Sequence, residues 1–219
     1  MNLPDYERVI YKRNPLVEVV CQLRFPTILK IANQDPVELQ DNIRDDYPLL
    51  EISKEIPFIP EFARMLQPGE VQSFTETVYN FRSEDLKWQV SLNRNFIGFT
   101  TKEYKRYEIF KEKFQKIVEI FEGIYKPAFY SRIGLRYQDL IVRSKLNIDN
   151  SWVELIPDYI APEFHSSEIA DSVIAFTKAV VIDLNGSNVT FRHGLVEARD
   201  TEESIGEPAY LLDADFFIE

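Results

Sequence analysis

Two segments of the chain alternate apolar and more polar residues with a period of two. In residues 15–25 every odd position is apolar and Glu18, Gln22 and Arg24 lie between them, and a similar alternation recurs in residues 131–142. A period of two is typical of a strand that buries one face. The pattern therefore predicts one strand over each of these segments.

A different spacing predicts a helix in the middle of the chain. In residues 104–122 apolar side chains recur at intervals of three and four, and Gly123 follows as a stop signal. Residues 49–70 hold three prolines and predict a long connection. The other expected elements are helices over 36–47 and 150–156 and strands near 71–82, 86–93, 95–101, 168–184, 188–196 and 208–218.

These elements fall into two similar halves. We expect an α+β fold: a single domain over residues 1–219 made of a duplicated β-α-β-β-β-α unit, roughly 15–122 and 131–219, with a mainly antiparallel sheet and helices on one face. Three ordered matches support the duplication: 21–25 with 133–137, 37–39 with 153–155, and 90–93 with 182–185. The second unit lacks the last helix. We therefore expect a truncated end, a partner that covers the last strand, or a unit that never had this helix.

Three motifs spread along the chain carry a family resemblance. They are NPLVEVV at residues 14–20 with LRF at 23–25, RIGLRY at 132–137, and YLLDADFF at 210–217. Together they resemble a sporadically distributed family of uncharacterised prokaryotic proteins. The resemblance implies no activity, cofactor or catalytic residue, but its patchy distribution implies a mobile or defence-associated context. Members typically continue into a C-terminal helix, which is the element that this chain lacks.

Arginine and glutamine occupy the faces of the two alternating strands that lie opposite the apolar side chains. Gln22 and Arg24 share this face of the first strand, and Arg132, Arg136 and Gln138 share it in the second. If the two strands are central and related by a pseudo-twofold axis, Arg24 and Arg136 lie close together. Paired guanidinium groups suit a carboxylate, a phosphate or the acidic tail of a partner. These five residues form the candidate ligand-binding site.

A structural role for the same arginines is the alternative. Each guanidinium would then pair with an acid of its own chain. The candidate internal partners are Glu18, Glu76 and Asp215.

Motifs for catalysis, metal binding and phosphate binding are absent from the sequence. The two histidines, His165 and His193, lie 28 residues apart and have no cysteine companion, so a zinc site is not indicated. With 7 glycines and no Walker or G-x-G-x-x-G loop, a phosphate-cradling loop is not indicated either. The single cysteine, Cys21, falls on the apolar side of its strand, where we expect a core residue and not a nucleophile. The sequence favours a non-enzymatic protein without a metal or cofactor.

Charge is distributed unevenly along the chain. Residues 1–145 carry 22 basic and 21 acidic side chains, whereas residues 146–219 carry 3 and 15, and the net charge is −11. This charge disfavours nucleic-acid binding, because such binding depends on neutralising phosphates. No run of 18 apolar residues and no signal-like start occur, and one cysteine fits a reducing compartment. We therefore expect a cytoplasmic protein that does not bind membranes.

Three functional hypotheses remain open. The favoured one is a non-enzymatic binding or assembly module of a prokaryotic, mobile or defence-associated system, which holds a protein partner or a second copy through its open sheet face or C-terminal edge. The second is an enzyme or sensor that binds a small anionic ligand, such as a nucleotide, at the arginine pair. The third is nucleic-acid binding on the sheet face, which the charge disfavours.

Overall fold

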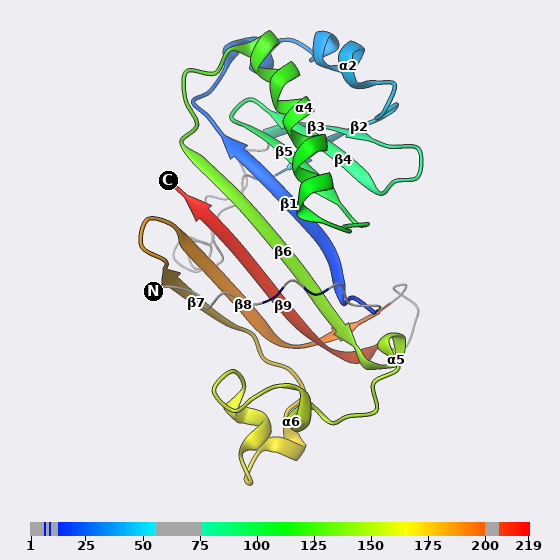
Figure 1. The fold of residues 1–219 in the computed structure, drawn as a ribbon, viewed down its shortest axis with the longest axis vertical. Coiled ribbons are helices and arrows are strands. Elements are labelled where there is room, and N and C mark those ends of the chain that lie inside the picture. The colour runs from blue at the N-terminus through cyan, green and yellow to red at the C-terminus, as the bar shows by residue number, and fades with distance from the viewer. Residues whose placement is uncertain (1–6, 8, 10–12, 56–75, 200–205) are drawn as a thin grey trace. The chain divides into compact units, whose positions relative to one another are not determined.

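Strands dominate the structure. The computed structural model describes residues 7, 9, 13–55, 76–199 and 206–219, and the strands of this part of the chain form one mainly antiparallel sheet (Figure 1). They are β1 (Leu16–Arg24), β2 (Leu49–Glu55), β3 (Glu76–Arg82), β4 (Trp88–Asn93), β5 (Phe96–Thr101), β6 (Arg132–Val142), β7 (Lys178–Asp183), β8 (Asn188–Ala198) and β9 (Glu207–Ile218). The expected α+β class with a mainly antiparallel sheet is confirmed.

Helices connect several of these strands. They are α1 (Leu29–Asn33), α2 (Val37–Ile43), α4 (Tyr107–Tyr125), α5 (Arg143–Leu146) and α6 (Trp152–Leu155), with short 3-10 helices η2 (Pro162–His165) and η3 (Ala170–Ser172). Within the described residues, no helix has the length and apolar character needed to cross a membrane.

The chain divides into two compact units. One contains Val20–Gly134 and is called the 20–134 unit; the other contains Leu135–Ile218 together with the start of β1, and is called the 135–218 unit. The division falls within β1 and β6, whereas the sequence places it between residues 122 and 131. Each of these two strands therefore contributes residues to both units.

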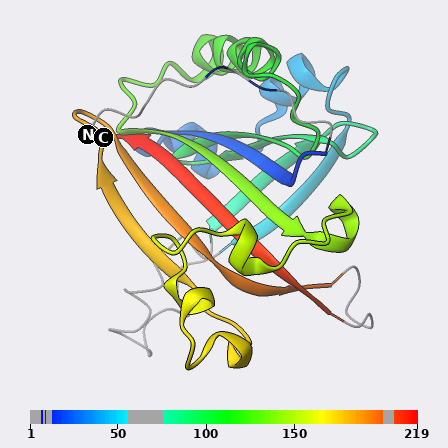
Figure 2. The same ribbon diagram turned by 60° about the horizontal axis from the view of Figure 1, so that its bottom comes forward.

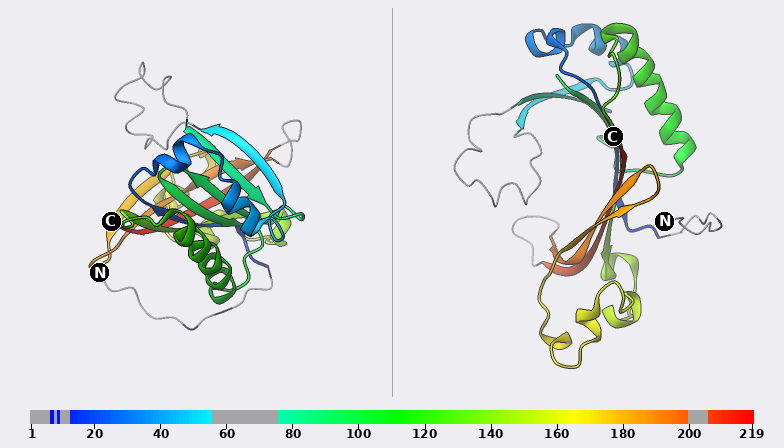
Figure 3. Two further views of the ribbon diagram at one scale, coloured as in Figure 1. Left: turned by 90° about the horizontal axis from the view of Figure 1, so that it is seen from above. Right: turned by 90° about the vertical axis from the view of Figure 1, so that its left-hand side faces the viewer.

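The 20–134 unit packs α4 along one face of its strands, as Figure 3 shows. Its strand order is β2-β3-β4-β5-β1. The buried ring of Phe99 on β5 lies at the centre of this core, with its centroid 5.2 Å from that of Phe110 and 5.5 Å from that of Phe114 on α4. Phe25, just after β1, packs against Phe121 at 4.9 Å between centroids. The apolar spacing that predicted α4 is thus the face that builds this core.

The opposite face of the same strands carries a hydrogen-bonded polar network. The Ser91 hydroxyl donates to Asn80 Oδ1 at 2.7 Å, and Gln89 Nε2 donates to the same oxygen at 3.0 Å. Asn80 in turn donates to the Ser53 hydroxyl at 3.2 Å. Asn80 and its neighbour on this face, Val78, are both buried. This face therefore combines a polar network with buried side chains.

The 135–218 unit has the strand order β6-β9-β8-β7. Its helix α6 and 3-10 helices gather near one end of the strands, as Figure 2 shows. They build a second core, whose buried members are Ile156, Ala161, Phe164, Leu195 and Tyr210. The β7–β8 hairpin turns through Asn185 and Gly186, which have φ angles of 60° and 109°. Two successive positive φ angles are typical of the two-residue turn that joins twisted antiparallel strands.

Several boundaries differ from the sequence prediction. The strand expected near 168–184 is confined to β7, and Ala170–Ser172 forms η3 instead. Leu49–Glu55 forms β2, where a connection over 49–70 was expected, because β3 pairs with it residue for residue and provides main-chain partners; residues 56–70 lie outside the described residues. Helix α4 continues past Gly123 and ends before Lys126, which adopts a left-handed φ of 49°. Lysine takes the conformation for which glycine was expected.

The duplication stays a prediction. In each unit the first strand lies beside the last, β1 beside β5 and β6 beside β9, as two copies of one topology would have it. However, the match of Leu92 with Leu184 is wrong, since Leu92 lies in β4 between two strands, whereas Leu184 follows β7 at the end of the order. The placement of all helices on one face of the sheet also stays a prediction.

Candidate functional site

Arg136 on β6 is held by an acid of its own unit. Its Nε donates to Asp213 Oδ1 at 2.6 Å and its Nη2 to Asp213 Oδ2 at 2.7 Å. Asp213 on β9 is only 3% exposed, and Arg192 on β8 approaches the same carboxylate at 3.7 Å. The hydrogen bonds to Asp213 are the main reason why the pKa of Arg136 is raised, and the nearby Asp215 carboxylate adds to this effect. Arg136 therefore already has the carboxylate partner that an external anion would supply.

The other candidate residues are distributed over both units. In the 20–134 unit Arg24 Nε donates to Gln22 Oε1 at 2.9 Å, and the guanidinium of Arg132 lies so close to Gly134 that a Cβ there would be 2.5 Å from its Nη1. Gln138 is half-buried in the 135–218 unit. Since Arg24 and Arg136 belong to different units, their predicted proximity stays a prediction. Of the internal acids considered, Glu76 pairs with Arg94 at 2.6 Å.

A buried polar cluster in the 135–218 unit is absent from the sequence prediction. His193 on β8 is 4% exposed, and its Nδ1 shares a 2.7 Å hydrogen bond with the hydroxyl of the buried Tyr210 on β9. Burial is the main cause that lowers the pKa of His193, and the Lys178 ammonium lowers it further. Burial also raises the pKa of Tyr210 to about 12. The pair is therefore a neutral imidazole bonded to a neutral phenol.

Lys178, the first residue of β7, lies opposite His193 in the β7–β8 register. Its ammonium contacts both carboxylate oxygens of Glu163 on η2, at 2.7 and 2.8 Å. The alternation in β8 contains a signal for this cluster, because a histidine at an apolar position, between Phe191 and Leu195, needs a polar partner when buried. No group of three His, Cys, Asp or Glu side chains in the described ranges could hold a metal ion.

Strand β7 ends the strand order and offers main-chain groups for pairing. It pairs with β8 on one side, and alternate residues of such a strand point their N–H and C=O groups away from the neighbour. Its four central residues, 179–182, are apolar and include no proline. Val180 is 49% exposed and Val181 is 66% exposed.

Edges of native sheets are usually guarded by charge, proline or a covering segment. The strand at the other end of the order, β2, has Glu51 and Lys54 within it, and Glu51 pairs with Arg82 at 2.7 Å. In β7 the charged residues are the first and the last, Lys178 and Asp183, and Lys178 forms an ion pair with Glu163. Among the described strands, β2 also exposes Leu49, Leu50 and Ile52, but β7 is the end strand without a charged residue at its central positions.

The expectation of a C-terminal edge is wrong. The last strand, β9, lies between β6 and β8 and pairs with β8 from Glu207 to Phe217. Its apolar side chains Leu211, Leu212, Phe216 and Phe217 are half-buried, and Ile218 is 52% exposed. The edge of this unit is a strand from the middle of its sequence.

Comparison with known proteins assigns no family to these features: no protein-family model matches the chain, and no curated protein matches it at a significant level.

Proposed function

We propose that the protein is a non-enzymatic binding module that holds a partner protein by strand addition to β7. The observation that carries this proposal is the exposed apolar edge formed by residues 179–182. In strand addition the main-chain hydrogen bonds provide affinity, and alternate side chains on each face provide specificity. Val181 on one face and Val180 on the other would select a partner segment with apolar side chains at matching positions.

The family resemblance supports a prokaryotic setting for this module, in a mobile or defence-associated system. The alternative is a small anionic ligand at the arginine pair. It is less well supported because the guanidinium of Arg136 already donates two hydrogen bonds to the carboxylate of Asp213. Nucleic-acid binding is disfavoured by the 15 acidic and 3 basic side chains of residues 146–219.

Site-specific photo-crosslinking tests the proposal in cells. Val181 is replaced by a photoreactive phenylalanine derivative, and adducts are identified by mass spectrometry. The control places the same group at Leu86, which is 56% exposed in the turn between β3 and β4. We expect one dominant protein adduct at position 181 and not at position 86.

A charged substitution in β7 makes this test specific. Val180→Lys introduces the type of charge that protects natural edge strands, and it should abolish the adduct while leaving the unfolding midpoint unchanged, because Val180 is half-exposed. The purified partner should then bind the unmodified protein at least tenfold more tightly than Val180→Lys. Equal adducts at positions 86 and 181, an adduct that survives Val180→Lys, or an adduct with a second copy of this chain would overturn the proposal.

A further inference from the structure

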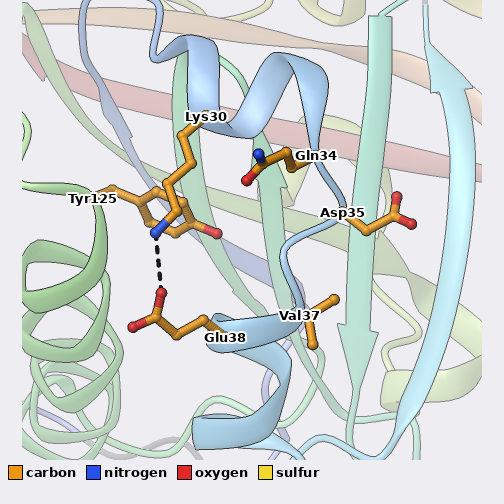
Figure 4. Close-up of a pocket in the computed structure, with 6 residues that line it drawn as sticks. All are labelled: Lys30, Gln34, Asp35, Val37, Glu38 and Tyr125. Atoms are coloured by element: carbon orange, nitrogen blue, oxygen red, sulfur yellow. Dashed lines mark hydrogen bonds and ion pairs between the residues drawn. The ribbon is translucent and has the colours of Figure 1, made fainter.

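A pocket lies in the 20–134 unit beside α1, α2 and the end of α4. Its volume is about 490 Å³, and Figure 4 shows the side chains around it. They combine one amine, two carboxylates, one amide, one phenol ring and one aliphatic group: Lys30, Asp35, Glu38, Gln34, Tyr125 and Val37. The formal charge of these six residues is −1 at neutral pH.

The ammonium of Lys30 already occupies a cation site inside this pocket. Its Nζ lies 3.0 Å from Glu38 Oε2, as the dashed line in Figure 4 marks, and 5.5 Å from the centroid of the Tyr125 ring. A carboxylate combined with an aromatic face is a general arrangement for holding an alkylammonium group. The side chains of Lys30 and Glu38 are 49% and 60% exposed, so this pair can be opened by a competing cation.

A second carboxylate lines the same pocket. Asp35 Oδ1 accepts a hydrogen bond of 2.9 Å from the hydroxyl of Tyr79, and Figure 4 shows its side chain apart from the Lys30–Glu38 pair. Burial raises the pKa of Tyr79, and it raises that of Tyr125 to about 12. Both phenols therefore stay neutral near pH 7. The charged side chains that line the pocket are therefore two carboxylates, Asp35 and Glu38, and one amine, Lys30.

We propose that this pocket binds an aliphatic diamine. One ammonium group takes the place of Lys30 between Glu38 and the Tyr125 ring, and the other pairs with Asp35, while the methylene chain contacts Val37. An anionic ligand is disfavoured because the two carboxylates of the lining, Asp35 and Glu38, outnumber its one cation, Lys30, and would repel an anion. The proposal concerns a different unit and a different class of ligand from the strand addition at β7, so each can fail without the other.

Isothermal titration with 1,4-diaminobutane at low ionic strength provides the test, with butylamine and 1,4-butanediol as matched probes. We expect saturable 1:1 binding of the diamine, binding of butylamine weaker by roughly tenfold or more, and no binding of the diol. Equal affinities for the diamine and butylamine, or the absence of saturable diamine binding, would overturn the proposal.

Three variants separate this site from general attraction of cations to an acidic protein. Glu38→Gln should weaken diamine binding by about tenfold or more, and Lys30→Met should strengthen it, because the internal competitor is removed. The matched control is Glu112→Gln on α4, whose carboxylate pairs with Lys116 at 3.1 Å and is 71% exposed, and it should leave binding unchanged. Equal effects of Glu38→Gln and Glu112→Gln, or unchanged binding in Lys30→Met, would contradict the assigned site.

Discussion

The guanidinium of Arg136 and the carboxylate of Asp213 form a two-bond contact between β6 and β9, with N···O distances of 2.6 and 2.7 Å. Asp213 is 3% exposed, whereas Arg136 is 38% exposed. The arginine thus supplies hydrogen-bond donors and a positive charge to a buried carboxylate, whose desolvation would otherwise be uncompensated. This geometry indicates a structural role for a residue that the sequence places in a ligand site.

The contact predicts that Arg136→Gln destabilises the fold. Removing one partner leaves the buried carboxylate of Asp213 with the more distant Arg192, and we expect a loss of about 2 kcal/mol in the free energy of unfolding, below the range for fully buried pairs because Arg136 is partly solvated. Urea denaturation measures the loss. Arg44→Gln is the control, since the pair of Arg44 with Asp41 is exposed on both sides. If the two variants lose the same stability, the contact does not contribute as we infer.

The pair of His193 with Tyr210 predicts a pH dependence of stability. The pKa of His193 is lowered in the folded state, chiefly by burial, whereas in the unfolded chain it returns to about 6.5. The unfolded state then binds more protons in the window below pH 6.5. The contribution of His193 is therefore fully present above this pH and is lost as the pH falls toward the folded-state value.

Urea unfolding of the protein and of His193→Gln between pH 8 and pH 5 tests this dependence. The stability difference between the two proteins should shrink as the pH falls, because only the protein with His193 loses the contribution of a buried neutral imidazole. The charged groups near this imidazole are Lys178 and Glu163. His165→Gln is measured in parallel to separate the contribution of the second histidine, which is exposed on η2. A constant difference for His193→Gln would mean that burial does not control this titration.

The single cysteine, Cys21, is partly buried on β1 and provides a test of the packing around this strand. Burial raises the pKa of Cys21 to about 12, so only on the order of one thiol in ten thousand is ionised at pH 8, compared with roughly one in four in an unfolded chain. We expect the native protein to react with a thiol-specific disulfide reagent at least 100-fold more slowly than the protein in urea. Fast reaction of the native protein would place Cys21 in a different environment.

The local sequence pattern predicted where helices and strands form better than which strands and side chains contact one another. The spacing of Phe110 and Phe114 predicts α4 because helical periodicity depends on neighbouring residues alone. The partner of Arg136 could not be predicted in this way, since Asp213 and Asp215 share one face of β9 and only the strand register decides between them. The same reason applies to β2: its pairing with β3 is a long-range property, and the prolines that follow it favoured a connection.

The functional features show the same limit. The apolar run at residues 179–182 is visible in the sequence, but its position at the end of the strand order is a property of the sheet. The pocket brings Tyr125 beside Lys30, which lies 95 residues earlier in the chain. Such a contact leaves no local pattern.

Two glycines in different environments predict opposite effects of the same substitution. A Cβ at Gly194 on β8 would overlap the carbonyl oxygen of Phe176, a main-chain atom that cannot move away easily, whereas a Cβ at Gly123 in α4 would meet no atom within 4 Å. Gly194→Ala should therefore lower the free energy of unfolding by about 2 kcal/mol or more. Gly123→Ala should raise it by about 0.5 to 1 kcal/mol, because alanine favours the helix. Thermal and urea unfolding of both variants measure the two effects, and a Gly194→Ala protein as stable as the original would show that the segment before β7 does not pack against β8 as closely as we describe.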